Sequence, residues 1–426
     1  MTGTAAGGPA GRAEASERVV ITGIGAITPV GNDRETTWRQ LVAGASGVGP
    51  ITAFDASGLP VRIAAEVRGF SPEDFLDRRR LRRTARFAQF AVAAAREAVA
   101  DAGLAITADN ADRVGVVINA AVAGFDTVED ATRQVLDGRG ARLSPYFVAS
   151  SLANMPACEV AMDLGVHGPV NASALACASG IYALLEARRL ILAGEADVVI
   201  CGGTDAAIKP VMFAGLAVMG ALSRRNDDPP AASRPFDADR DGFVFGEGAV
   251  ITVAESAEHA RRRGADPYAA IAGGALTCDA FHVSAPHPDA TYAAAAITQA
   301  LQRSGTKPAE VDYICAHGTS TRANDATETA AIRAAFGADA DQVAVSAPKS
   351  MVGHLIGAAG ALGAMVCALA IRTGVVPPTI NLHTPDPLCD LDYVPNVARQ
   401  MPVRTAVTNA FGFGGQNVVA VFTAPD

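Results

Sequence analysis

The sequence has few aromatic residues, few charged residues and almost no lysine. Aromatic residues make up 5% of the 426 residues and charged residues 19%, and only 3 lysines stand against 32 arginines. The formal net charge is −9, so the chain lacks the basic surface with which a general nucleic-acid binder neutralises phosphates. A hydrophobic content of 50% excludes disorder, and the length allows two or three domains or one large fused unit. Because alanine and glycine take the place of the missing aromatics, the core must consist largely of small side chains.

Disulfides, a signal peptide and a membrane span are also missing from the pattern. The 7 cysteines include no C-x-x-C pair, and an odd number cannot form a complete intramolecular set. We therefore expect reduced thiols and a cytoplasmic location. Residues 1–17 have no apolar stretch and are predicted to form a flexible tail. The longest uncharged apolar run, 355–371, is slightly too short to cross a membrane, which predicts a buried helix and no membrane partner.

Short apolar runs alternate with helical patterns along the chain. Strands are predicted at 19–24, 114–118, 198–201, 250–253, 311–315, 343–346 and 418–422. Helices are predicted at 84–102, 181–193, 293–304, 325–336 and 358–372. This alternation predicts an α/β protein with buried sheets. Because Cys177 and His354 each open an apolar helix that a glycine follows, we expect a duplicated unit, with halves at 18–264 and 265–426.

Cys177 stands in a run of small residues, NASALACASG, where a strand-like stretch leads into a helix. The N-terminus of a helix stabilises a thiolate, so we expect a lowered pKa and a reactive sulfur. The alternative interpretation is a buried structural thiol, which we prefer for the other six cysteines.

Two histidines lie in glycine-rich turns. His317 follows a predicted buried strand, and His354 opens a helix five residues after Lys349. A helix N-terminus disfavours the imidazolium, so His354 is expected to be neutral and able to donate a hydrogen bond. Both histidines could instead be structural, and their spacing with Cys177 matches no zinc site. The turn at 409–417, NAFGFGGQN, can expose backbone N–H groups to an oxyanion, or it can be an ordinary turn.

The segments VVITGIGAITPVGN, ACASG, AHGTST, KSMVGHLIGAAGA and AFGFGGQN follow one another in this order. In them the chain resembles the β-ketoacyl-acyl carrier protein synthases of the type II, elongating kind. The resemblance implies the thiolase fold, in which two duplicated βαβαβαββ halves form a five-layer α-β-α-β-α sandwich. It also implies a decarboxylative condensation of a Cys-bound acyl chain with a malonyl thioester, giving a 3-oxoacyl thioester and CO2. No cofactor would be bound, since acyl carrier protein brings both substrates on its phosphopantetheine.

The resemblance further assigns roles to residues. Cys177 is the expected nucleophile, and His317 and His354 are the expected hydrogen-bond donors to an enolate oxygen. The arginine-rich run at 77–86 is either a solvated helix face or, as the resemblance implies, part of a docking site for the acidic carrier protein. The resemblance also implies that Lys349 orients the histidines, with Asp325 and Glu328 in its network, and that Phe413 is a gate whose backbone N–H shares the oxyanion hole with that of Cys177. Thr319 and Thr321 are expected to bind the pantetheine arm, and Val122 and Leu216 to line the acyl pocket. The arginines expected to dock the carrier protein are Arg79, Arg82, Arg83 and Arg142.

The sequence departs from the family pattern at Gly363, where a glutamate is usual, and at Leu216, where phenylalanine is common. Small residues at both positions are predicted to widen the space for a bulky or unsaturated chain. We therefore expect the ketosynthase of a type II polyketide pathway, as a homodimer or as a heterodimer with a chain-length subunit. Housekeeping fatty-acid elongation is the alternative. A non-catalytic partner subunit is disfavoured because Cys177 is present, and a thiolase because the turn at 411–415 lacks a cysteine.

Overall fold

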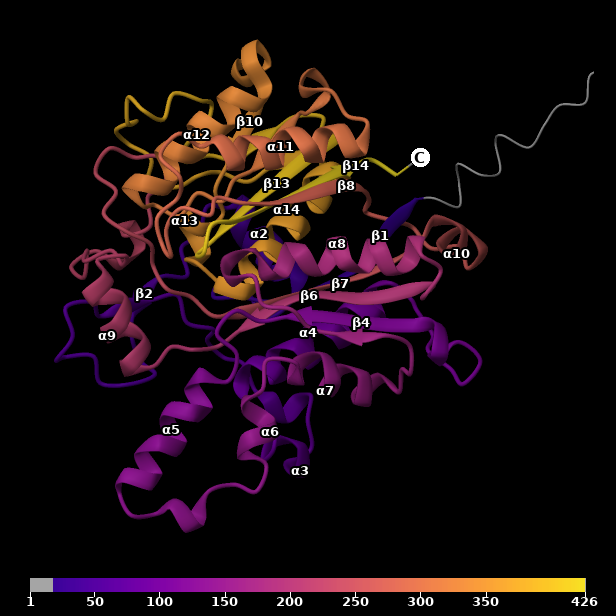
Figure 1. The fold of residues 1–426 in the computed structure, drawn as a ribbon, viewed down its shortest axis with the longest axis vertical. Coiled ribbons are helices and arrows are strands. Elements are labelled where there is room, and N and C mark those ends of the chain that lie inside the picture. Colours follow the sequence, from indigo (N-terminus) through magenta and orange to yellow (C-terminus); the bar gives the residue numbers. More distant parts are fainter. Residues whose placement is uncertain (1–17, 426) are drawn as a thin grey trace, which may run out of the picture.

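The computed structural model describes residues 18–425, so the predicted tail at 1–17 lies outside the described residues. Two sets of five strands form its framework (Figure 1). The first set runs in the order β5-β4-β6-β7-β1 and the second in the order β10-β9-β13-β14-β8. The first comprises β1 (Val19–Ile27), β4 (Val114–Asn119), β5 (Val170–Asn171), β6 (Val198–Asp205) and β7 (Gly248–Ser256). The second comprises β8 (Ala269–Cys278), β9 (Tyr313–Cys315), β10 (Ala344–Ser346), β13 (Thr405–Gly412) and β14 (Gln416–Thr423).

The two sets have the same topology. In each set, the second strand in chain order pairs in parallel with the third and with the fourth. The fifth strand pairs antiparallel with the first and with the fourth. Only the pairs Val20↔Ala270 and Ile21↔Ala269 join β1 to β8, so the sets are connected at one end. This repeated strand order is the duplicated fold that the sequence predicts.

Helices cover both sets and also separate them. α8 (Ser179–Leu192) and α14 (Ala359–Thr373) lie in the middle layer, where they contact each other and the strands on either side (Figure 1). α4 (Arg86–Asp101) and α7 (Met155–Leu164) cover the outer face of the first set. α11 (Thr291–Ser304) and α12 (Arg322–Phe336) cover the outer face of the second. The five layers are therefore α, β, α, β and α, as the resemblance implies.

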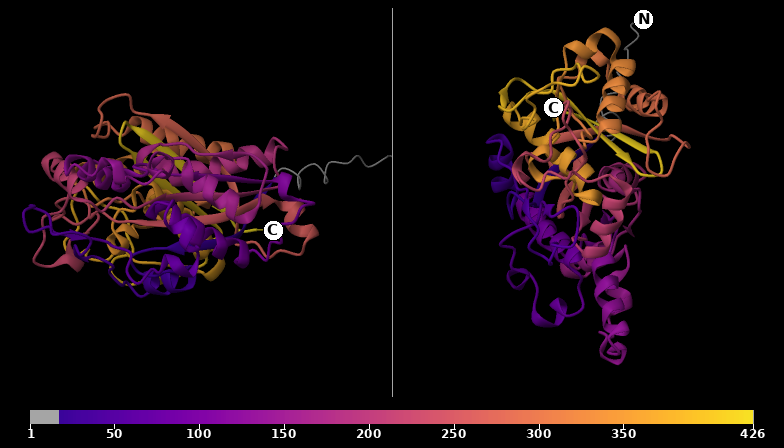
Figure 2. Two further views of the ribbon diagram at one scale, coloured as in Figure 1. Left: turned by 90° about the horizontal axis from the view of Figure 1, so that it is seen from below. Right: turned by 90° about the vertical axis from the view of Figure 1, so that its left-hand side faces the viewer.

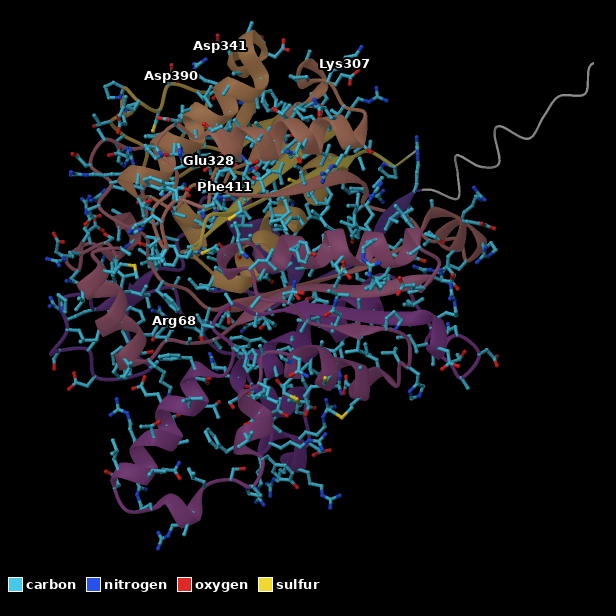
Figure 3. All side chains as sticks on the ribbon, in the orientation of Figure 1. Arg68, Lys307, Glu328, Asp341, Asp390 and Phe411 are labelled. Carbon is cyan, nitrogen blue, oxygen red and sulfur yellow. The ribbon has the colours of Figure 1, made fainter. Side chains whose placement is uncertain are left out.

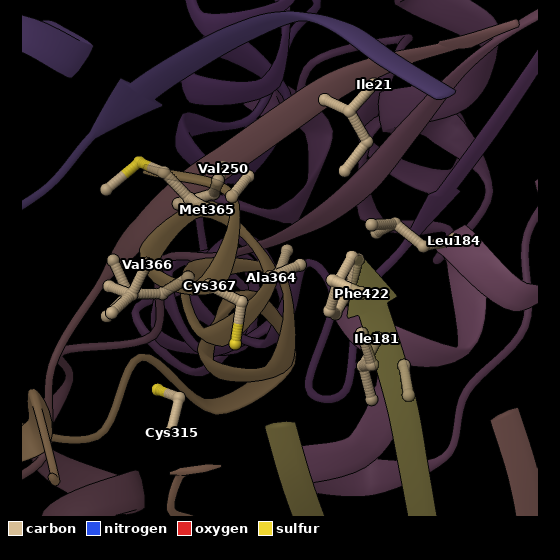
Figure 4. Close-up of a cluster of buried hydrophobic side chains, with 14 of the residues drawn as sticks. Ile21, Ile181, Leu184, Val250, Cys315, Ala364, Met365, Val366, Cys367 and Phe422 are labelled. Carbon is tan, nitrogen blue, oxygen red and sulfur yellow. The ribbon is translucent and has the colours of Figure 1, made fainter. Parts of the chain in front are cut away.

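Small residues allow the layers to approach closely. A Cβ atom on Gly180 of α8 would lie 2.6 Å from the carbonyl oxygen of Gly357, and one on Gly360 of α14 would lie 2.7 Å from the backbone nitrogen of Ile181. Around this crossing, side chains from both helices and both strand sets form one apolar cluster (Figure 4). The shortage of aromatic residues is thus matched by backbone-to-backbone packing, which larger side chains would prevent.

The helix predicted from the long apolar run is buried. The segment Ile356–Thr373 is apolar and long enough to cross a membrane, but 83% of it is buried inside the protein. Every residue from Ala359 to Ala370 is buried. This segment is therefore the central helix of the sandwich.

One hairpin projects from the body of the molecule. It consists of α5 (Phe125–Leu136), a short 3-10 turn (Gly140–Arg142) and α6 (Phe147–Ser151), and Figure 1 and the right-hand view of Figure 2 show it projecting below the layers. The predicted division after residue 264 falls between α10 (Ala257–Arg262) and β8, and it stays a prediction.

Candidate active site

A cavity of about 630 Å³ opens beside the N-terminal ends of the two central helices. Cys177, His317 and His354 all line it, although they come from segments far apart in the sequence. Val122, Leu216, Phe413, Thr319 and Thr321 also contribute to its lining. The structure therefore brings most of the predicted site residues to one place.

Cys177 lies in a 3-10 turn (Ala176–Ala178) directly before α8, and it is only 8% exposed. Burial raises the pKa of its thiol to about 11, and this effect outweighs the opposing charge of Lys349 and the backbone N–H of Phe413. The predicted lowering of this pKa is therefore wrong. The cause is desolvation, which penalises the thiolate more than the helix end stabilises it.

His317 is held through its backbone and by Lys349. The carboxylate of Glu328 accepts hydrogen bonds from the backbone N–H groups of His317 and Gly318, both at 2.7 Å, and from the Asn409 side chain at 3.0 Å. Lys349 Nζ donates to the His317 carbonyl at 2.6 Å and lies 3.5 Å from His317 Nδ1. A Lys349 ammonium facing Nδ1 favours the tautomer in which Nδ1 is the acceptor and Nε2 carries the ring proton. Burial and the Lys349 charge hold the pKa of His317 well below its usual value.

His354 is fixed by its own turn. Its Nδ1 accepts the backbone N–H of Ile356 at 3.1 Å, which places the ring proton on Nε2. This Nε2 is buried and has no hydrogen-bond partner among residues 18–425. Burial lowers the pKa of His354 well below its usual value, in agreement with the predicted neutral ring. The rings of His317 and His354 have centroids 5.5 Å apart, so two neutral N–H donors face one cavity.

The two predicted acids have different partners. Glu328, labelled with Phe411 in Figure 3, holds the backbone of the His317 turn. Asp325 instead accepts the backbone N–H of Phe236 at 2.9 Å and lies 3.6 Å from the Arg240 guanidinium. Burial raises the pKa of Asp325 to about 6.

The mouth of the cavity contains the turn between β13 and β14. Phe413 is 38% exposed there, and its backbone N–H is close enough to Cys177 to stabilise the thiolate. The hydroxyl oxygens of Thr319 and Thr321 lie 2.9 Å apart. Thr321 also caps α12, since its hydroxyl accepts the backbone N–H of Asn324 at 3.3 Å.

Gly363 does not widen this cavity, contrary to the sequence prediction. A Cβ atom there would lie 2.2 Å from Thr408 Oγ1 and 3.6 Å from Cys315 Sγ, and Gly363 is not part of the lining. The hydroxyl of Thr408 and the thiol of Cys315 occupy the adjacent space. Leu216, on α9 (Pro210–Met219), does line the cavity.

The arginines predicted to dock the carrier protein differ in their exposure and ion pairing. Arg79 and Arg82, in and after α3 (Arg78–Leu81), and Arg142 on the projecting hairpin are exposed. The Nε atom of Arg83, however, lies 3.6 Å from Glu159 in an ion pair. Arg83 is therefore partly committed to holding α3 against α7, which the sequence pattern could not indicate.

Two residues with clear structural roles were not predicted. Asn409 donates to Glu328, and the buried Asp205 accepts backbone N–H groups on two sides of the cavity. Asp205 is the last residue of a buried strand, a position from which a polar side chain often faces a site.

A buried cysteine and two neutral histidines at one cavity of a duplicated five-layer sandwich define a thiolase-fold condensing enzyme, an acyltransferase. The chain belongs to the β-ketoacyl synthase family, whose N-terminal domain matches residues 16–260 and whose C-terminal domain matches residues 268–383.

Individual relatives agree with this assignment. The chain is 50% identical over 406 residues to 3-oxoacyl-[acyl-carrier-protein] synthase 2 of Synechocystis, covering 95% of this chain and 98% of the relative. It is also similar to the ishigamide ketosynthase/chain length factor, with a TM-score of 0.90, 38% identity and coverage of 96% and 99%. A ketosynthase in complex with a type II polyketide acyl-carrier protein is also similar, with a TM-score of 0.89 and 34% identity. The match covers 96% of this chain and 99% of that ketosynthase.

Proposed function

We propose that this enzyme condenses a Cys177-bound acyl chain with a malonyl thioester of acyl carrier protein in fatty-acid elongation. The observation that carries this proposal is the joint lining of one cavity by Cys177, His317 and His354. The identity to the 3-oxoacyl-[acyl-carrier-protein] synthase 2 relative is 50%, against 34% and 38% for the polyketide ketosynthases. These values favour fatty-acid elongation, the alternative in the sequence analysis, over the expected polyketide pathway.

In the first half-reaction, Cys177 Sγ attacks the thioester carbonyl of the acyl carrier protein. The bond from Sγ to the acyl carbon forms, the bond to the carrier sulfur breaks, and the thiol proton ends on the departing carrier thiol. The backbone N–H groups of Cys177 and Phe413 stabilise the oxyanion that forms in between. Since the resting thiol is protonated, its proton leaves only as the carbonyl is engaged.

In the second half-reaction, the malonyl carboxylate leaves as CO2 and its bonding electrons pass to an enolate. His317 and His354 each offer an Nε2–H to the enolate oxygen, and one such donor typically contributes about 10²–10³ in rate. The enolate carbon then attacks the acyl carbon on Cys177, the bond from that carbon to Sγ breaks, and the released thiolate takes up a proton from solvent. Lys349 holds His317 by donating to its carbonyl and facing its Nδ1.

The remaining cavity residues define the substrate path. Thr319 and Thr321 contact the pantetheine arm near the mouth of the cavity, where Phe413 acts as a gate. Val122 and Leu216 face the acyl chain. Exposed Arg79, Arg82 and Arg142 attract the acidic carrier protein. No resident cofactor has a part in these steps.

A second ketosynthase-like chain is the proposed partner at the projecting hairpin. Leu136, Val148 and Tyr146 are 81%, 66% and 51% exposed on this hairpin and its flanks. β5, at the end of the strand order, leaves an unpaired edge close to α7. Exposed apolar surface and a free strand edge favour pairing with another chain. Light scattering of the purified chain distinguishes a homodimer from a monomer that needs a different subunit.

Intact-mass analysis tests the proposed reaction. The purified enzyme is mixed with saturated acyl carrier proteins of graded chain length, and then with malonyl carrier protein. We expect acyl transfer to wild-type Cys177, none to Cys177→Ala, and a 3-oxoacyl product without any added subunit. Acyl loading of Cys177→Ala at the wild-type level would refute the nucleophile assignment. A strict requirement for a chain-length subunit would favour the polyketide pathway instead.

A further inference from the structure

Asp205, at the end of β6, is a fully buried carboxylate whose hydrogen bonds all come from the backbone. Its Oδ2 accepts the N–H groups of Ala121 at 2.9 Å and Gly357 at 2.7 Å. Its Oδ1 accepts those of Val122 and Ala123, both at 3.1 Å. Burial raises its pKa to about 7 against the effect of these donors. Four N–H donors use all four lone-pair positions of the carboxylate, so the geometry suits the ionised form.

The four donors belong to two segments from different halves of the chain. Residues 121–123 follow β4, and Ala121 and Val122 line the cavity. Gly357 belongs to the turn between His354 and α14. Asp205 therefore joins the wall of the cavity to the turn that carries His354.

Both segments have strained backbones. Ala123 and Ile356 each have a φ of 51°, in the left-handed region. For a β-branched residue such as Ile356 this is a genuine outlier, and such conformations are energetically costly. They persist only where neighbouring groups hold them, and the bonds from Ala123 and Gly357 to Asp205 are placed to do so.

The strained turn also determines the proton position on His354. The Ile356 N–H donates to His354 Nδ1, and the next N–H along the chain, that of Gly357, donates to Asp205. If the turn relaxes, the Ile356 N–H moves away from Nδ1 and the tautomer is no longer fixed. The buried Nε2–H, which has no partner in the described part of the chain, then no longer points into the cavity.

We propose that Asp205 is a positioning residue for the condensation, which holds the His354 turn and the cavity wall in register through four backbone hydrogen bonds. This inference rests on the proposed function of His354 in decarboxylation. It assigns the carboxylate to the half-reaction that uses His354. The Asp205 charge also raises the pKa of the Cys177 thiol, so its removal should not slow the attack by Cys177.

The test compares the two half-reactions in Asp205→Asn. In either orientation the amide keeps one oxygen and presents its NH2 to two backbone donors, so two N–H groups lose their acceptor. CO2 release from malonyl carrier protein is measured in one assay, and transfer of a short acetyl group to Cys177 in another. We expect CO2 release to fall at least about 30-fold while acetyl transfer changes less than about threefold. Equal losses in both assays, or no loss in either, would overturn the proposal.

Glu97→Gln is the matched control. Glu97 on outer helix α4 also accepts two backbone N–H groups, from Ala26 at 2.9 Å and Arg34 at 2.7 Å, and it does not line the cavity. Both half-reactions should keep their wild-type rates in this variant. A selective loss of CO2 release in Glu97→Gln would mean that any disturbed carboxylate has this effect, and it would also overturn the proposal.

Asp205→Glu decides the question if Asp205→Asn does not fold. It keeps the charge and the acceptors but displaces them by one methylene. A loss of CO2 release of more than about fivefold with acetyl transfer preserved supports the proposal, and parallel changes in both assays overturn it. Failure of the proposed function itself would be visible separately, because the wild-type enzyme would then lack one or both half-reactions.

Discussion

Alkylation of Cys177 by iodoacetamide should become about tenfold faster with each unit of pH up to about pH 10. Only the thiolate reacts, and burial raises the pKa of this thiol to about 11. At pH 8 about 0.1% of the sulfur is then ionised, against about a tenth for a thiol at the ordinary value of 9.0. Removing Lys349 as Lys349→Met should slow the reaction further wherever the ammonium is charged, because its charge is the largest effect that lowers this pKa. Burial lowers the pKa of Lys349 itself, so the difference from wild type should shrink at the alkaline end of the series.

The assay follows the mass of the peptide that contains Cys177 after short exposures to the reagent across a pH series. The Cys177→Ala variant gives the background from the other cysteines. The same series on urea-denatured protein gives the rate for an unburied thiol, so the ratio of the two rates isolates the effect of burial. A rate that levels off below about pH 9, or that is unchanged by Lys349→Met, would refute the reasoning that desolvation controls this sulfur.

Further predictions concern packing, docking and chain length. Gly363→Ala should lower the free energy of unfolding in urea by about 1–3 kcal/mol, although Gly→Ala at an unhindered helix position raises it by up to about 1 kcal/mol. Adding Thr408→Ala should recover most of the loss. A Gly363→Ala variant more stable than wild type would contradict the close contact. Arg82→Glu should raise the KM for acyl carrier protein about three- to tenfold at low salt and lose this effect at high salt; a salt-independent change would argue against electrostatic docking. Leu216→Phe should reduce kcat/KM for the longest accepted acyl chain about 10–200-fold and leave the shortest chain unchanged; equal losses for both would remove Leu216 from the acyl pocket.

Most of the fold can be read from the sequence, because β-branched runs and helical periodicity are local properties. Each of the seven predicted strands lies on an observed strand. Two long strands were missed. β13 (Thr405–Gly412) runs into the segment 409–417, which the sequence analysis treated as a glycine-rich turn. β8 (Ala269–Cys278) was missed because its sequence, AAIAGGALTC, is rich in alanine and glycine and has little β-propensity. It becomes a strand by pairing with β14 and β1, a tertiary effect that no local pattern reports.

The site was less predictable where it depends on solvation and on contacts distant in sequence. The residue types at Cys177 and His354 indicated chemistry, but the direction of the Cys177 pKa depends on how much protein surrounds the sulfur. The effect of Gly363 depends on Thr408, 45 positions away, which fills the space that a glycine alone would suggest is open. Asp205 was overlooked because its partners are backbone groups, which leave no mark on the sequence.

The two halves share one topology but contribute different residues to the cavity. Cys177 lies within the 3-10 turn before α8, and His354 lies just before the matching turn that precedes α14, so the same end of each central helix carries a sulfur in one copy and an imidazole in the other. His317 and Lys349 also belong to the second copy. A chain with only one half folded therefore possesses either a nucleophile without enolate donors or donors without a nucleophile. With the proposed roles, turnover requires both halves, because the cavity is lined by Cys177 from one half and by His317 and His354 from the other.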